Sequence, residues 1–152
     1  MTVADRPRSR TGSRSSRATP RPEPKPLYVA LAWAEAHCVI PDGFRKGEPV
    51  RLYEWQGRRL THHYLVRPDA IWVPERPILG TAFVYRRSGM VGPQKLGKDP
   101  GEAIHICIEA DGPALFSGWA GTDEGWACRD MGCPCGWEYP YDPGEPKGMR
   151  WP

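Results

Sequence analysis

The abundance of glycine and proline is the feature that most constrains how this chain can fold. There are 17 glycines and 18 prolines among 152 residues, which approaches the composition of low-complexity or disordered chains. Seven tryptophans indicate the opposite, because aromatic residues in that number usually belong to packed structure. The length suits one domain of ordinary size and is short for two. We therefore expect one small domain whose composition lies near the limit of disorder.

The first 26 residues differ in composition from the rest. They contain seven basic and two acidic residues, five prolines, and no large apolar residue except Met1 and Val3. Such a segment cannot bury enough apolar surface to offset the entropy lost on ordering. We expect a disordered basic tail over residues 1–26, followed by one domain over residues 27–152. The tail either contacts nucleic acid through phosphates or only contributes solubility.

Two classes of protein are excluded by the apolar pattern. No apolar run approaches the ~20 residues that a membrane-spanning helix needs, so we expect no membrane partner. The charged start of the chain has no apolar segment behind it, so it is not a secretory signal. An intracellular protein is the expectation.

Periodicity and breaker residues predict the elements of the domain. Helices are expected over residues 27–39 and 53–66, each followed by a proline. A strand is expected over residues 81–91, which include β-prone Phe83, Val84 and Tyr85. The pattern of residues 101–111 fits a strand and a helix equally. The chain beyond Pro113 is dense in glycine, proline and tryptophan, and we expect it to be irregular.

A candidate phosphate loop follows the predicted strand. Residues 92–98 have the spacing G-x-x-x-x-G-K, but Asp99 stands where Ser or Thr is expected. Glycines allow backbone N–H groups to converge on phosphate oxygens, and the lysine reaches the terminal phosphates. This context favours a helix for residues 101–111. The alternative is a glycine-rich surface turn that carries Lys95 and Lys98.

These residues resemble a known family. The segment around the phosphate loop resembles the Walker A region of the large terminase subunit of tailed bacteriophages of actinobacterial hosts. Three further pieces of the chain, in the same order and spacing, resemble the segments before and after that region. The matching pieces are residues 39–44 with 51–56, 85–88 with 91–98, 109–116, and 135–139 with 144–146.

The resemblance implies a fold, a function and partners. The fold would be α/β, a partial P-loop NTPase-like domain with an incomplete sheet and flanking helices. The protein would use ATP and Mg²⁺ in the motor that packages double-stranded DNA into the capsid, with the small terminase subunit and the portal protein as partners. It would be encoded by a phage or prophage and act in the host cytoplasm.

The resemblance also implies roles for individual residues. Gln56 would bind the adenine, and Arg86 and Arg87 would face phosphate or DNA, although two solvated arginines are the commoner explanation. Either Lys98 or Lys95 would be the phosphate lysine. The residues expected to bind the ATP phosphates are Gly92, Gln94, Lys95, Gly97, Lys98 and Asp99.

The residues that complete ATP hydrolysis are missing. A Walker B carboxylate should follow a second apolar strand, but Asp123 and Glu124 follow Gly-Trp-Ala-Gly-Thr. No nuclease domain with clustered carboxylates follows either. We therefore expect the first portion of a terminase ATPase domain, truncated before Walker B, with little ATPase activity of its own.

The five cysteines suggest a metal site as an alternative function. Their odd number argues against a disulfide framework. Cys128, Cys133 and Cys135 are close enough in sequence to hold zinc, with His105, Cys107 or another distant group as the fourth ligand. Otherwise they are thiols in a tight loop. His37, His62 and His63 are interpreted as ordinary surface or packing residues. The alternatives to a terminase fragment are thus a small zinc-dependent nucleic-acid-binding module and an inactive remnant.

Overall fold

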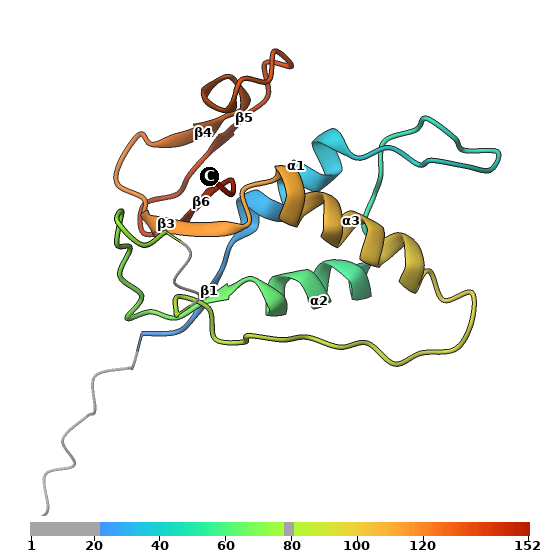
Figure 1. Ribbon diagram of the computed structural model, residues 1–152, viewed down its shortest axis with the longest axis horizontal. Helices are drawn as coiled ribbons and strands as arrows, with labels where there is room; N and C mark the ends of the chain where they lie inside the picture. The colour runs from blue at the N-terminus through green and yellow to red at the C-terminus, as the bar shows by residue number, and fades with distance from the viewer. Residues whose placement is uncertain (1–21, 78–80) are drawn as a thin grey trace, which may run out of the picture.

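The computed structural model describes residues 22–77 and 81–152, and it shows a mixed α/β fold. Most of the predicted tail, residues 1–21, lies outside the described residues. Three helices lie on one side of the molecule, and the strands of the C-terminal third lie on the other (Figure 1). The α/β expectation is therefore confirmed at this coarse level.

Three α-helices are present in the described part of the chain, where the sequence predicts or allows them. They are α1 (Tyr28–His37), α2 (Glu54–His63) and α3 (Lys98–Asp111). Helix α1 buries Val29, Ala30, Trp33 and Ala34 against the core, as its alanine-rich sequence allows. Helix α3 resolves the ambiguity of residues 101–111, because Ile104 and Ile108 lie four residues apart on its buried face.

The strands of the described residues form three separate two-stranded antiparallel sheets. Strand β1 (Lys25–Pro26) pairs with β2 (Leu65–Val66), β3 (Leu115–Trp119) with β6 (Pro146–Met149), and β4 (Gly125–Ala127) with β5 (Glu138–Pro140). Ordered structure thus begins inside the segment predicted as tail. The prediction of an irregular region beyond Pro113 is wrong, since four strands and a 3₁₀ helix, η1 (Cys128–Met131), lie there.

The predicted strand over residues 81–91 is also wrong. Only a bridge between Phe83 and Val66 forms, supported by two backbone hydrogen bonds to residues 65 and 67. Beyond it the chain is exposed and has no pairing partner among the described residues, so local β propensity is not enough to form a strand. Every strand pair among residues 22–77 and 81–152 is antiparallel. The described structure therefore lacks the parallel sheet expected of a P-loop domain.

The core lies between the helices and the C-terminal strands. Its most deeply buried large side chains include Leu27, Val29, Tyr64, Val66 and Ile108. The segment from Thr81 to Gly97 runs beside α2 before it enters α3 (Figure 1). In the part of the chain that is described, no helix has the length and apolar character needed to cross a bilayer.

Candidate functional site

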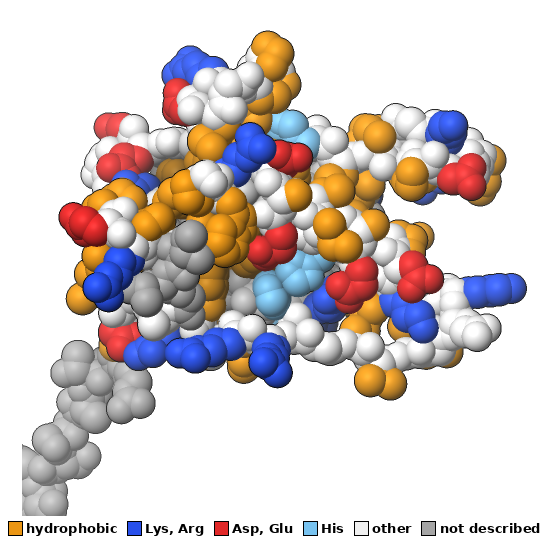
Figure 2. Space-filling view, in the orientation of Figure 1, with side chains coloured by type: hydrophobic (Ala, Val, Ile, Leu, Met, Phe, Trp, Pro, Cys, Tyr) orange, Lys and Arg blue, Asp and Glu red, His pale blue; other side chains and the backbone are white. Residues whose placement is uncertain are grey.

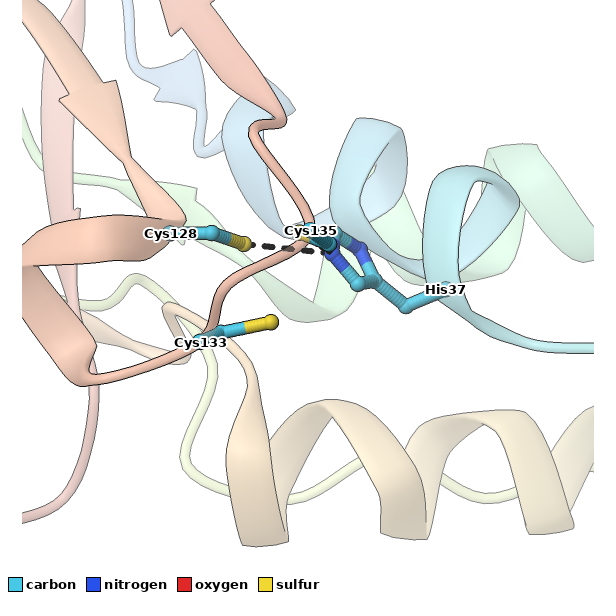
Figure 3. A group of neighbouring side chains, drawn as sticks. All are labelled: His37, Cys128, Cys133 and Cys135. Carbon is cyan, nitrogen blue, oxygen red and sulfur yellow. Dashed lines mark hydrogen bonds between the residues drawn. The ribbon is translucent and has the colours of Figure 1, made fainter.

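Four metal-ligating side chains meet where α1 approaches the β4–β5 hairpin. His37 is the last residue of α1, Cys128 follows β4, and Cys133 and Cys135 lie in the loop before β5 (Figure 3). The nitrogen and sulfur ligand atoms all lie within 4.8 Å of one another. The group joins two parts of the chain that are 91 residues apart.

The spacing of these atoms fits a tetrahedral metal ion. His37 Nε2 lies 3.1 Å from Cys128 Sγ and 3.3 Å from Cys135 Sγ. Around a zinc ion with ordinary bond lengths, nitrogen and sulfur ligands are about 3.6 Å apart and two sulfurs about 3.8 Å apart. Shifts of up to about 1 Å would therefore place the four ligands around one ion. One histidine and three thiolates are a common ligand set of structural zinc sites.

The helix holds the His37 ring with one nitrogen toward the sulfurs. Nδ1 lies 2.9 Å from the Trp33 carbonyl oxygen, one turn earlier in α1. Because a carbonyl only accepts, Nδ1 carries the proton and donates, and Nε2 is left as the ligand. The ring also stacks on the Trp33 ring, with 4.9 Å between the ring centroids. It packs edge-on against the Trp137 ring, with 5.2 Å between the centroids. This arrangement is the backbone-carbonyl support that metal-bound histidines usually have.

Two glycines turn the cysteine loop back on itself. Gly132 and Gly136 have φ of 78° and 75°, a left-handed conformation that other residues rarely adopt. The Cys133 N–H donates to the Cys128 carbonyl at 3.1 Å, and the Cys128 N–H donates to the Trp137 carbonyl at 3.0 Å. The three thiols therefore converge because the backbone between them is closed by its own hydrogen bonds.

The thiols differ in acidity. The backbone N–H of Trp137, followed by His37 and Cys133, lowers the pKa of Cys135 to about 6. Burial, followed by the neighbouring Cys135 and Cys133, raises the pKa of Cys128 to about 12. A metal ion binds the thiolate, so binding at neutral pH must release the Cys128 proton. The affinity of such a site for a metal ion would therefore rise as the pH rises.

The structure brings together the three cysteines named from the sequence and adds a ligand that the sequence analysis missed. The sequence alone suggests an ordinary histidine at position 37, but His37 completes the group. Of the two residues suggested as fourth ligand, Cys107 is exposed on α3 and His105 belongs to a different cluster. No spacing in the sequence links His37 to the cysteines, because tertiary packing alone makes them neighbours.

The candidate phosphate loop lies at the start of α3, at the opposite end of the helix from Asp111. Gly97 has φ of 83°, and the helix begins at Lys98. Gly92 and Lys98 are half-buried, whereas Gln94, Lys95 and Asp99 are exposed. This geometry neither supports nor contradicts nucleotide binding, so the phosphate-binding roles of these residues stay predictions.

Gln56 contacts the end of this loop. Its Nε2 donates to the Gly97 carbonyl at 3.1 Å, and its Oε1 accepts from the Tyr53 N–H at 2.9 Å. The side chain is 5% exposed. Both ends of the amide are thus used within the protein, where they join the start of α2 to the start of α3. The adenine-binding role stays a prediction.

Arg86 and Arg87 lie in the exposed segment beside α2. A groove of about 500 Å³ separates this segment from the helix. Its walls carry aromatic and basic side chains, and basic side chains gather along the lower edge of the molecule over this segment (Figure 2). The residues that line the groove include Trp55, Arg58, Arg59, His62, Tyr85 and Arg87.

Comparison with known proteins yields no relative. No protein-family model matches the chain, and neither the curated proteins nor the solved structures contain a significant match. The resemblance to terminase large subunits is therefore neither supported nor contradicted by these comparisons.

Proposed function

We propose that this chain is a zinc-stabilised module that binds nucleic acid. The observation that carries the proposal is the convergence of His37, Cys128, Cys133 and Cys135, whose ligand atoms lie within 4.8 Å. Four protein ligands leave no open position for a substrate, which is typical of structural zinc and not of catalytic zinc. The ion would join α1 to the β4–β5 hairpin, and so would stabilise the contact between the helices and the C-terminal strands.

The groove beside α2 is the proposed nucleic-acid surface. Arg87 makes no ion pair with any other residue that the structure describes, and Arg58 pairs only with the exposed Glu54. Arginine neutralises phosphate charge, and the rings of Trp55 and Tyr85 offer faces on which bases can stack. Stacking requires unpaired bases, so a single strand fits this groove better than a duplex. The basic residues of the first 26 positions would add sequence-independent affinity.

Removal of two arginines that line the groove tests the proposal. The double variant Arg58→Ala/Arg87→Ala should bind a fluorescent single-stranded oligonucleotide at least about 10-fold more weakly than the wild type. The slope of log affinity against log salt should also fall by about 1 for each phosphate that the protein no longer neutralises. Fluorescence anisotropy at several salt concentrations measures both quantities.

The matched control removes the same charge elsewhere. Arg45→Ala/Lys46→Ala changes two exposed basic residues in the loop between α1 and α2, and it should leave affinity and salt slope near the wild-type values. Equal weakening by both double variants would contradict a role for the groove and would show that only net charge matters. A duplex that binds more tightly than the single strand would contradict the stacking part of the proposal.

Nucleotide binding, as part of a terminase-type DNA-packaging motor, is a second candidate. One contact supports it: the buried Gln56 side chain touches Gly97, so the two segments that resemble the adenine-binding and Walker A regions of terminases lie together. The start of α3 would present backbone N–H groups to a phosphate. DNA is a partner in both candidate functions.

Substitution of Lys98 tests this second function. If the loop binds ATP, Lys98→Ala should weaken ATP–Mg²⁺ binding about 10-fold or more, because the lysine contacts the terminal phosphates. Lys46→Ala is the control, since this lysine lies in the exposed loop between α1 and α2. Isothermal titration measures the affinity. If ATP–Mg²⁺ gives no heat of binding with the wild-type protein, the loop does not bind the nucleotide. If Lys98→Ala binds ATP–Mg²⁺ as tightly as the wild type, this lysine does not contact the phosphates.

A further inference from the structure

A second group of metal-ligating side chains lies between α2 and α3. It consists of His63, the last residue of α2, and His105 and Glu109, which are one turn apart on α3. One nitrogen or oxygen of each side chain lies within 4.8 Å of the others. Around one ion, such ligand atoms would be about 3.4 Å apart. The group shares no residue with the cysteine site.

His63 has one ring nitrogen available for an ion. Its Nδ1 lies 2.9 Å from the Ser88 hydroxyl, which leaves Nε2 without that partner. The His63 ring meets the His105 ring at 4.4 Å between centroids and at 77°. A metal-bound histidine usually has its other ring nitrogen held by a hydrogen bond, and the Ser88 hydroxyl could serve His63 in this way.

His105 presents a buried nitrogen that makes no hydrogen bond. Nε2 has no hydrogen-bond partner among the described residues, and Glu109 Oε1 lies 3.7 Å from it, within the range of an ion pair. A buried polar atom without a partner is costly, so such atoms in native proteins need an explanation. An ion between His105 and Glu109 supplies one.

The charged groups around His105 fix where its ring proton lies before an ion binds. Arg59 donates to Nδ1 at 3.5 Å and is paired with Glu102 at 2.6 Å. Because arginine only donates, Nδ1 accepts and Nε2 carries the proton, 3.7 Å from Glu109 Oε1. An ion at Nε2 would require the proton on Nδ1 instead, which lies 3.8 Å from the Glu102 carboxylate.

Glu109 is held in place by a buried tyrosine. The Tyr64 hydroxyl donates to Glu109 Oε1 at 2.6 Å, and Tyr64 is 2% exposed. The carboxylate is therefore oriented before any ion arrives, and it keeps lone pairs for coordination. It borders a cavity of about 490 Å³ that His63, Tyr85 and Trp151 also line.

From this geometry we infer a second metal site, in which His63, His105 and Glu109 bind a divalent transition-metal ion of the zinc class. Two imidazoles and one carboxylate are the protein ligands of metal sites that keep a position for an exchangeable water. That position would face the cavity, where a small anion could replace the water. The cysteine site has four protein ligands and no such position, so the two ions would differ in chemistry.

Cobalt titration separates the two sites. With Co²⁺ as the probe, the wild-type protein should bind two ions, one with the strong sulfur-to-metal absorption of thiolate ligands and one without it. His63→Gln should lose only the ion without that absorption, as should Glu109→Gln. His62→Ala removes the exposed neighbouring histidine and should still bind two ions. Cys128→Ser should lose only the thiolate-bound ion.

The outcomes distinguish this inference from the proposed function. One ion in the wild type, removed by Cys128→Ser and retained in His63→Gln, would overturn the second site and leave the zinc-stabilised module intact. If the wild type binds one ion and His63→Gln loses it, the second site would stand and the zinc-stabilised module would be overturned. Azide added to cobalt-loaded wild-type protein should change the spectrum of the second ion only. An unchanged spectrum would overturn the open position, and this measurement does not depend on how well any variant folds.

Discussion

Loss of one cysteine ligand, in Cys128→Ser, is expected to lower the melting temperature by about 10 °C in the presence of zinc. An ion that binds only the folded state stabilises it by about 4 kcal/mol when free zinc is about 1,000 times its Kd. In a chain of this size, each kcal/mol changes the melting temperature by roughly 2–4 °C. Cys128 is 1% exposed, and its thiolate would be one of four ligands joining α1 to the β4–β5 hairpin. Thermal unfolding followed by circular dichroism measures the effect.

Two controls make this result specific to the metal. Cys107→Ser changes an exposed cysteine of α3 that is outside the site, and should melt within about 2 °C of the wild type. EDTA should lower the melting temperature of the wild type and of Cys107→Ser by at least as much as the Cys128→Ser substitution does. It should lower the melting temperature of Cys128→Ser by less, because that variant has already lost the thiolate-bound ion. If EDTA leaves the wild type unchanged, the four side chains do not hold a stabilising ion.

Gly148→Ala is expected to reduce the free energy of unfolding by about 2–3 kcal/mol, within the usual range for overpacked cores. A Cβ at this position would lie 2.7 Å from the Pro113 carbonyl oxygen and 2.7 Å from Val29 Cγ1. The first neighbour is backbone and the second belongs to the buried face of α1, so neither can move away freely. Urea denaturation measures the loss of stability.

Gly57→Ala is the matched control for this substitution. Gly57 lies inside α2, and a Cβ there would meet nothing within 4 Å. Alanine favours the helix and restricts the unfolded chain, so stability should rise by up to about 1 kcal/mol. Equal urea midpoints for Gly148→Ala and the wild type would contradict the close packing of β6 against α1.

The helices could be predicted from the sequence because their determinants are local. The alanine-rich segment after Leu27 and the segment closed by Pro68 contain both the apolar periodicity and the helix-ending signals. The sequence of α3 fits two patterns, and the glycine-rich loop before it favours the correct one. The ends of α1 and α2 differ from the prediction by one to three residues, as is usual where helix termini fray.

The strands could not be predicted because their pairing partners are distant. Strand β3 pairs with β6, about 30 residues later, across a region whose glycine and proline content predicts irregular structure. In contrast, residues 83–85 have strong β propensity and form only one bridge, since no further strand of the described chain lies beside them. Strand formation depends on a neighbour more than on the residue itself.

The sequence by itself determined that Cys128, Cys133 and Cys135 are close together. The outer two are seven positions apart, and Gly132 and Gly136 permit the turns that bring them together. Only the tertiary structure decided that His37 joins them and that His63 meets His105 and Glu109. The physical reason is the same in both cases: helices α1 and α2 are placed by burial of their apolar faces, and this packing sets which polar side chains at their ends become neighbours. No local pattern in the sequence contains that information.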